Sequence, residues 1–317
     1  IFLFFNLSIH IGSNSFLGYY LMDYIKNKKK EEVYGVSFSK NSNSFKNYEF
    51  EFLDINDKNS IKKRLMEISP DKIYCLDIID SVSYVWEHPK EAIDFQIKGI
   101  ISLLESIRTI DKKISIFFTG SGEEYSFKGF DNIPISENTS LEPLNVYAVS
   151  KSCQNMIAQV YAKAYGLNII IGRLFNDVGA RQTENFVLSS ICKQVIKIKK
   201  GLQDPIINVG NINSARDFID VRDTVKAIYS LLEFGKPSEI YNIASGKSFT
   251  IRELIEKVKS ISKIDFNIVI DSKKIRLNDI PIIQGDITKI IEQTGWSPKI
   301  SIDETIKWIF EYWKSKI

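Results

Sequence analysis

Short apolar runs alternate with segments of helical periodicity along the first half of the chain. Runs rich in Ile, Leu, Val and Phe predict strands, which fall at residues 7–11, 33–38, 50–53, 114–119 and 167–173, with one more inside 71–79. Apolar residues spaced three and four apart predict the helices between them, at residues 16–25, 61–68, 93–107 and 145–164. Strands separated by helices of this length indicate an α/β fold with a doubly wound parallel sheet.

The pattern changes after about residue 176, where helices dominate. They are predicted at residues 185–200, 221–234, 251–261 and 302–314, with short strands at 205–209 and 266–270. We therefore expect residues 1–176 to form mainly the sheet domain. Residues 177–317 should form mainly a smaller, mixed α/β lobe that binds the substrate and closes over the sheet. Some strands and helices of this second part are expected to return to the first.

Composition limits the possible classes of function. The net charge is only +3 over 317 residues, and the basic residues are scattered, so we expect no nucleic-acid partner. Three cysteines far apart in the sequence and two histidines argue against a disulfide scaffold and against a metal site. This cysteine usage fits a reducing cytoplasm. The apolar start, residues 1–5, is too short to cross a bilayer, so we expect no membrane segment.

A stretch with two glycines joins the first predicted strand to the first predicted helix. It reads Gly12-Ser-Asn-Ser-Phe-Leu-Gly18. A Rossmann-type domain holds the pyrophosphate of a dinucleotide at this place, against backbone N–H groups at the positive end of a helix. Ser15 replaces the middle glycine of the usual pattern, and its Cβ would narrow the approach to the pyrophosphate. The stretch predicts cofactor contacts from Gly12, Asn14, Ser15, Phe16 and Leu17.

The ends of the second and third strands bear on the choice of cofactor. An acidic residue after the second strand would bind the ribose hydroxyls of NAD, but the chain has Ser37 and Lys40 there. We therefore favour NADP over NAD. Asp54, followed by Ile55, ends the third strand, and its carboxylate could accept a hydrogen bond from the adenine amino group. A helix cap or a turn is the alternative for this carboxylate.

Tyr147 and Lys151 are the candidates for proton transfer. Four residues apart on a predicted helix, they share one face, and a cation beside a phenol lowers the phenol pKa from about 10. Such a pair can give a proton to a substrate oxygen. The same spacing occurs at Tyr24 and Lys28, so spacing alone indicates only a solvated helix face.

A second polar stretch, Thr119-Gly-Ser-Gly-Glu-Glu-Tyr125, follows the strand predicted at 114–119. Small and hydroxyl residues at the carboxyl end of such a strand face the ligand crevice of an α/β sheet. Ser121 could hold a substrate carbonyl beside Tyr147, and Glu123 could act as a base or orient a sugar hydroxyl. A solvated turn is the alternative for either residue taken alone.

Over nearly its whole length the chain resembles the extended short-chain dehydrogenase/reductase family. Ser121 and the Tyr147-Ala-Val-Ser-Lys151 stretch match the catalytic triad of that family, and further stretches match at Arg173-Leu-Phe-Asn176, Arg216-Asp-Phe and Thr294-Gly-Trp-Ser-Pro298. Within the family it is most similar to the GDP-mannose branch. That branch holds GDP-mannose 4,6-dehydratase and the reductase acting next, which makes GDP-rhamnose from GDP-4-dehydro-6-deoxymannose.

The resemblance implies a nucleotide-sugar site and a dimer. It implies that a GDP-sugar is bound by side chains of the second half, namely Asn176, Asn185, Val187, Lys193, Asn211, Arg216, Arg276 and Asp279. It also implies a homodimer in which the helices at 93–107 and 145–164 of each subunit form a four-helix bundle. The chain departs from the family pattern at Ser15, at Asp77, where an alanine is usual, and at Gln96, where an asparagine is usual.

Four readings of the function are therefore open. The first is a reductase that adds hydride from NAD(P)H to the C4 keto group of a GDP-linked 6-deoxy-hexose, with Tyr147 as proton donor. The second is the 4,6-dehydratase, in which Glu123 removes the C5 proton. The third is a C4 dehydrogenase or epimerase of another GDP-sugar. The fourth is a non-catalytic homologue that binds a nucleotide sugar, against which the intact Ser121, Tyr147 and Lys151 argue.

Overall fold

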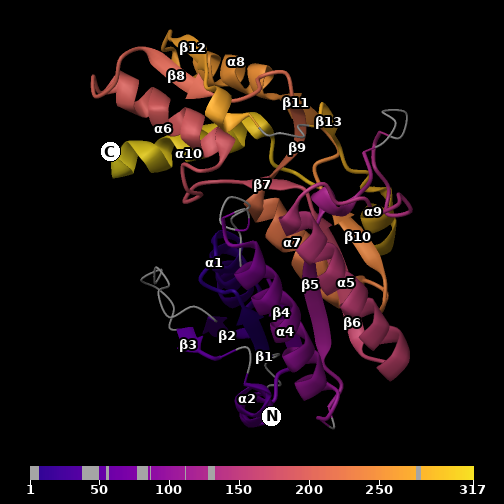
Figure 1. The fold of residues 1–317 in the computed structure, drawn as a ribbon. Coiled ribbons are helices and arrows are strands. Elements are labelled where there is room, and N and C mark those ends of the chain that lie inside the picture. Colours follow the sequence, from indigo (N-terminus) through magenta and orange to yellow (C-terminus); the bar gives the residue numbers. More distant parts are fainter. Residues whose placement is uncertain are drawn as a thin grey trace.

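The computed structural model describes residues 7–37, 50–54, 57–76, 85, 87–110, 112–127, 133–275 and 280–317. Its elements form two lobes, with the large sheet in one and the helices α6, α8 and α10 in the other (Figure 1).

A seven-stranded parallel sheet forms the larger lobe. Its strands run in the order β10-β6-β5-β4-β1-β2-β3, so the chain reverses its direction across the sheet between β1 and β4. A ligand crevice is expected at such a switch point, beyond the carboxyl ends of the strands. The strands are β1 (Leu7–Ile11), β2 (Glu32–Ser37), β3 (Phe50–Phe52), β4 (Lys72–Cys75), β5 (Ser115–Ser121), β6 (Asn168–Leu174) and β10 (Ile240–Ile243).

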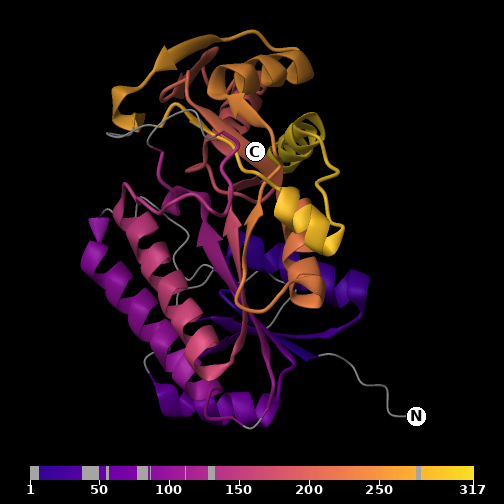
Figure 2. The same cartoon turned by 90° about the vertical axis from the view of Figure 1, so that its right-hand side faces the viewer.

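Helices cover both faces of this sheet (Figure 2). One face packs against α2 (Lys58–Ile68), α4 (Pro89–Ile107) and α5 (Val146–Tyr165). The other packs against α1 (Phe16–Asp23), which continues as the π-helix η1 (Tyr24–Lys29), and against α7 (Val221–Phe234) and α9 (Thr288–Thr294). A parallel sheet buried on both faces is what the near-continuous apolar strands require.

The smaller lobe has its own apolar core. That core joins α6 (Val187–Lys199), α8 (Ile251–Ser262), α10 (Ile302–Lys316) and a parallel strand pair, β8 (Ile206–Val209) with β12 (Asn267–Ile270). A second small sheet holds β7 (Asn176–Val178), β9 (Ala215–Asp220), β11 (Ser248–Thr250) and β13 (Ile282–Ile283). The described residues also form two short 3-10 helices, η2 (Gly122–Glu124) and η3 (Ser272–Lys274).

The α/β class and the doubly wound parallel sheet predicted from the sequence are confirmed. Two later elements belong to the large lobe, since β10 pairs with β6 and α7 packs on the sheet. The exact boundary at residue 176 stays a prediction. The sequence analysis did not predict β7, β9, β10, β11, β13 or α9.

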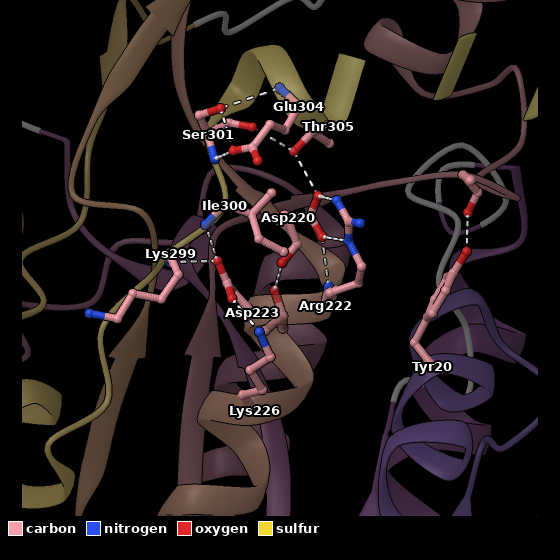
Figure 3. Close-up of polar contacts among 12 residues, drawn as sticks. Tyr20, Asp220, Arg222, Asp223, Lys226, Lys299, Ile300, Ser301, Glu304 and Thr305 are labelled. Carbon is pink, nitrogen blue, oxygen red and sulfur yellow. Dashed lines mark hydrogen bonds and ion pairs between the residues drawn. The ribbon is translucent and has the colours of Figure 1, made fainter. Parts of the chain in front are cut away.

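The last helix is tied to the large lobe through the start of α7 (Figure 3). Asp223 accepts hydrogen bonds from the backbone N–H groups of Lys299 and Ile300, both at 2.7 Å, just before α10 begins. The hydroxyl of Thr305 on α10 donates to the Asp220 carboxylate at 2.7 Å. Because these carboxylates are buried, α10 is held firmly where the two lobes meet.

Candidate active site

A pocket of about 160 Å³ lies at the carboxyl end of the large sheet, between the two lobes. The start of α1, the segment from β5 through η2, and the start of α5 line one side. The other side comes from the end of β6, β7 and the segment before α6. The lining residues are Ser15, Phe16, Leu17, Gly120, Ser121, Gly122, Glu123, Tyr147, Leu174, Phe175, Asn176, Asp177, Gln182, Phe186 and Ile283.

The glycine stretch forms the turn from β1 into α1. Gly12 has φ +76°, a left-handed conformation that favours glycine. A Cβ on Gly18 would lie 2.5 Å from the Gly12 carbonyl oxygen, so only glycine lets the helix pack this closely on the turn. Ser15 has an ordinary φ of −76°, and its hydroxyl accepts a hydrogen bond from the Gly18 N–H at 3.1 Å. Ser15 is therefore the N-cap of α1, a role that the sequence analysis did not assign.

The N-terminus of α1 can receive an anion. The N–H groups of Phe16 and Leu17 belong to the first turn of the helix, where no preceding helical carbonyl can accept them. The same residues line the pocket. Backbone N–H groups at a positive helix end fit the pyrophosphate of a dinucleotide.

Ser121, Glu123 and Tyr147 come together in the pocket, as the sequence analysis expected. Ser121 caps η2, because its hydroxyl accepts from the Glu123 N–H at 3.1 Å. Asn145 caps α5 by accepting from the Ala148 N–H at 2.8 Å, and its amide nitrogen donates to the Glu123 carboxylate at 2.7 Å. Asn145 thus connects the carboxylate to the helix that carries Tyr147.

Lys151 lies behind these residues and is fully buried. Its ammonium donates to the carbonyl and the hydroxyl oxygen of Thr119, at 3.0 and 3.1 Å. Gln154 donates to the same carbonyl at 3.0 Å and accepts from the Gln96 amide at 2.7 Å. Gln96 also accepts from the Ser150 hydroxyl at 3.1 Å. Gln96, one of the departures from the family pattern, therefore belongs to the buried network around Lys151.

A buried ion pair holds η2 against the sheet. Glu124 is fully buried and pairs with the Arg173 guanidinium on β6 at 3.2 Å. It also accepts from the Ser121 N–H and the Asn155 amide, both at 2.7 Å. Arg173 lies 4.5 Å over the Tyr125 ring, and burial raises the pKa of the Tyr125 hydroxyl, so this phenol stays protonated. The network fixes the backbone that carries Ser121 and Glu123.

The other predicted cofactor contacts lie at the strand ends. Ser37 ends β2 and is buried. Asp54 is exposed, and its carbonyl accepts from the Asp57 N–H at 3.0 Å, while Asp57 is the N-cap of α2. A role for Asp54 at the adenine stays a prediction. Lys40, Ile55 and Asp77 lie outside the described residues.

The predicted substrate contacts are spread over the smaller lobe. Asn176 begins β7, is exposed and lines the pocket. Lys193 pairs with Glu184 and lies 4.8 Å over the Trp313 ring, and burial lowers its pKa. Arg216 donates to the Ile280 carbonyl at 2.7 Å. These positions, which stay predictions, lie outside the pocket lining: Asn185, Val187, Lys193, Asn211 and Arg216. Arg276 and Asp279 lie outside the described residues.

The sequence analysis missed most of the far wall of the pocket, which includes Asp177, Gln182, Phe186 and Ile283. Asp177 and Gln182 follow β6, the neighbour of β5 in the sheet. The rule that placed Ser121 at the crevice, polar residues after a strand, applied to them as well. Ile283 comes from a two-residue strand far along the chain, and its approach to the pocket has no local signal.

Comparison with known proteins places the chain among nucleotide-sugar enzymes. The family model described as GDP-mannose 4,6 dehydratase matches residues 11–309. The chain is 29% identical to the GDP-6-deoxy-D-mannose reductase of Pseudomonas aeruginosa over 248 residues, 78% of this chain and 82% of the relative. It is 32% identical to the GDP-mannose 4,6 dehydratase 1 of Arabidopsis thaliana over 260 residues, 80% of this chain and 71% of the relative.

Solved structures are similar over almost the whole chain. The structure of RMD from Pseudomonas aeruginosa complexed with NADPH has a TM-score of 0.87 and 26% identity, and the match covers 99% of both chains. The UDP-glucose 4-epimerase of Thermotoga maritima has a TM-score of 0.88 at 24% identity, which shows a shared fold. Within the described residues, the helices are too short or too polar to cross a membrane, and no group of three His, Cys, Asp or Glu is placed to hold a metal.

Proposed function

The chain belongs to the GDP-mannose 4,6 dehydratase family, and from this premise we propose that it reduces the C4 keto group of a GDP-4-keto-6-deoxy-hexose. The reaction would use NADPH and would give a GDP-linked deoxysugar of the GDP-rhamnose type for polysaccharide biosynthesis. The observation that carries the proposal is the pocket in which Ser121 and Tyr147 face the start of α1.

The structural match to RMD supports the reductase within the family. The match to RMD covers 99% of both chains, and the reductase relative is matched over 82% of its length. Coverage alone does not separate the two activities, because dehydratase relatives are matched over 71% of their length in Arabidopsis thaliana and over 90% in Homo sapiens.

In this proposal the cofactor lies at the carboxyl ends of β1 and β2. The Gly12 turn, Asn14, Ser15 and the N–H groups of Phe16 and Leu17 would hold its pyrophosphate, and Ser37 its ribose. The bound NADPH supplies the hydride. The structure of RMD is a complex with NADPH, which supports NADP over NAD for this chain.

Tyr147 would donate its hydroxyl proton to the C4 oxygen of the substrate as the carbonyl is reduced. Ser121 would donate a hydrogen bond to the same oxygen and fix the carbonyl in the pocket. Lys151, held by Thr119, would keep a positive charge on the α5 face that carries Tyr147. On the far wall Asn176 would contact the GDP-sugar. The other predicted contacts of the smaller lobe would bind its diphosphate and ribose.

The second candidate is 4,6-dehydration, and Glu123 is the observation that favours it. Its carboxylate lines the pocket, where it could remove the C5 proton of the hexose. The two reactions differ in cofactor balance, because the dehydratase regenerates its cofactor within each cycle.

The test is the absorbance at 340 nm of purified protein with NADPH and GDP-4-dehydro-6-deoxymannose. The proposal expects one NADPH oxidised for each substrate consumed, and slower oxidation of NADH. GDP-mannose with NADP in catalytic amount serves as the comparison. Formation of a 4-keto sugar from GDP-mannose, with no net change at 340 nm, would instead identify the dehydratase.

We also propose a cytoplasmic homodimer. Apolar side chains are exposed along α5 at spacings of two turns and one turn, with Val149 at 38%, Met156 at 57% and Val160 at 59% exposure, and Ile101 on the adjoining α4 at 39%. Two subunits could bury this surface in a four-helix bundle. Cys75, Cys153 and Cys192 form no disulfide, which fits a reducing compartment.

The dimer is tested by light scattering on Val160→Glu, which should be monomeric because it puts a charge in the apolar contact. Leu202→Glu is the matched control, since Leu202 is 64% exposed in another part of the molecule, and it should stay dimeric. A Val160→Glu protein that is still a dimer would contradict this interface.

A further inference from the structure

The turn of residues 179–182 stands in the far wall of the pocket, between β7 and α6. Its last residue, Gln182, lines the pocket and yet is only 3% exposed. The side-chain nitrogen of Gln182 donates to the Asp177 carbonyl oxygen at 2.9 Å. A carbonyl can only accept, so this bond fixes which end of the amide is the nitrogen.

The amide oxygen, Oε1 of Gln182, is the unusual atom. It is buried, and it has no hydrogen-bond partner in the part of the chain that the structure describes. A buried polar atom left without a partner costs about 1–3 kcal/mol. An acceptor held in this way in a pocket wall is suited to a donor supplied by a ligand.

Two sets of contacts hold the main chain of the turn and so restrict where the Gln182 side chain can reach. The Tyr20 hydroxyl on α1 donates to the Ala180 carbonyl at 2.7 Å (Figure 3). A Cβ on Gly179 would lie 2.8 Å from Val221 and 2.9 Å from Trp308, which shows how closely α7 and α10 enclose the turn.

The second clamp lies on the smaller lobe. The Gln182 carbonyl accepts from the Ser189 hydroxyl of α6 at 2.6 Å. The same hydroxyl oxygen accepts from the Trp313 indole N–H of α10 at 3.0 Å. Both lobes therefore hold the turn that places Gln182 in the lining of the pocket.

The chemistry of the acceptor decides what it can bind. Phosphate oxygens only accept, so Oε1 repels the diphosphate of a nucleotide. Hexose hydroxyls donate, and Ser121, Glu123 and Tyr147 place the reacting hexose in this same pocket. We propose that Gln182 binds a hydroxyl of the substrate hexose and so helps to select the sugar. This inference rests on the proposed function for the identity of the ligand as a GDP-hexose.

The test compares Gln182→Met with Gln203→Met. Methionine keeps the length of the side chain and removes the amide. Gln203 is the matched control because its amide also donates to a backbone carbonyl, that of Ile206 at 2.7 Å, in a position outside the pocket lining. Calorimetry gives the Kd for GDP-mannose and for GDP, and the difference between them is the contribution of the hexose to binding. Steady-state kinetics give KM for the keto sugar and for NADPH.

We expect Gln182→Met to raise the Kd for GDP-mannose and the KM for the keto sugar about tenfold, as loss of one buried hydrogen bond predicts. The Kd for GDP and the KM for NADPH should change less than about twofold, and Gln203→Met should change none of them. If Gln182→Met does not fold, Gln182→Asn is used instead. Its side chain is one methylene shorter, so the amide oxygen no longer reaches as far.

Three results would overturn the inference. For Gln182→Met they are an unchanged Kd for GDP-mannose, a Kd for GDP that rises as much as the Kd for GDP-mannose, and a rise in the KM for NADPH alone. Failure of the proposed function looks different, since the wild-type protein would not oxidise NADPH with the keto sugar. The ratio of GDP-mannose to GDP affinity would still test Gln182 in that case.

Discussion

The two walls of the pocket are built in different ways. The wall that carries Ser121 and Glu123 is fixed from within the large lobe, through the capping bonds of η2, the Asn145 amide and the buried Glu124–Arg173 pair. The opposite wall, which carries Gln182, is fixed by partners far away in sequence. Tyr20 lies 160 positions before Ala180, and Trp313 lies 124 positions after Ser189.

From this difference we infer that the first wall mainly serves the reaction and the second mainly binds the sugar. A wall that is held within one lobe can keep its reacting groups in place whatever lies opposite. The position of a wall held by both lobes depends on how the two lobes pack against each other. The pocket for the substrate lies between the lobes, so this packing affects how the sugar is bound. We therefore expect changes in the first wall to affect kcat, and changes in the second to affect mainly KM for the sugar.

The largest effect should come from Tyr147→Phe. Removing the proton donor should lower kcat about 10³-fold, because general acid catalysis contributes roughly 10² to 10⁴. The affinity for GDP-mannose should change less than about twofold, since the ring remains. Stopped-flow or steady-state absorbance at 340 nm measures the first and calorimetry the second. A variant with wild-type kcat would remove Tyr147 from the mechanism.

The next effect concerns the fold of the first wall. Arg173→Met leaves the buried Glu124 without its cation, which should lower the free energy of unfolding by about 3–5 kcal/mol in a urea titration. Lys314→Met breaks the exposed pair with Glu311 and should cost less than about 1 kcal/mol. Equal losses in the two variants would mean that the buried pair does not hold η2.

Much of the fold could be predicted from the sequence because it follows from local patterns of apolar and turn residues. The strand at 7–11 and the helix at 221–234 have the predicted bounds, because apolar periodicity and turn residues mark both ends. The five missed strands have two to six residues, and their burial depends on partners far along the chain, as where β10 pairs with β6. Pairing between strands that are far apart in the sequence leaves no periodic pattern of apolar residues to detect along the chain.

The same contrast applies to the candidate site. Ser121 and Tyr147 lie in stretches whose type and spacing point to chemistry, so they could be proposed from the sequence. Ser15 could be placed in the turn, but its role as the cap of α1 depends on its backbone conformation. Gln182 has no local signal for its unpartnered oxygen, which follows only from the positions of Asp177, Ser189 and the lobes.

The smallest effect should come from Tyr20→Phe, which removes only the hydroxyl that holds the Ala180 carbonyl. One lost hydrogen bond should lower the free energy of unfolding by about 1 kcal/mol, and a looser turn should raise KM for the sugar about threefold with kcat unchanged. Tyr24→Phe is the matched control, because Tyr24 lies one turn further along and packs its ring against Tyr229. If both variants gave the same KM, the turn would not depend on α1, and the far wall would be a product of the smaller lobe alone. A rise in KM for the sugar only in Tyr20→Phe would mean that the helix at the cofactor site also shapes the wall that recognises the hexose.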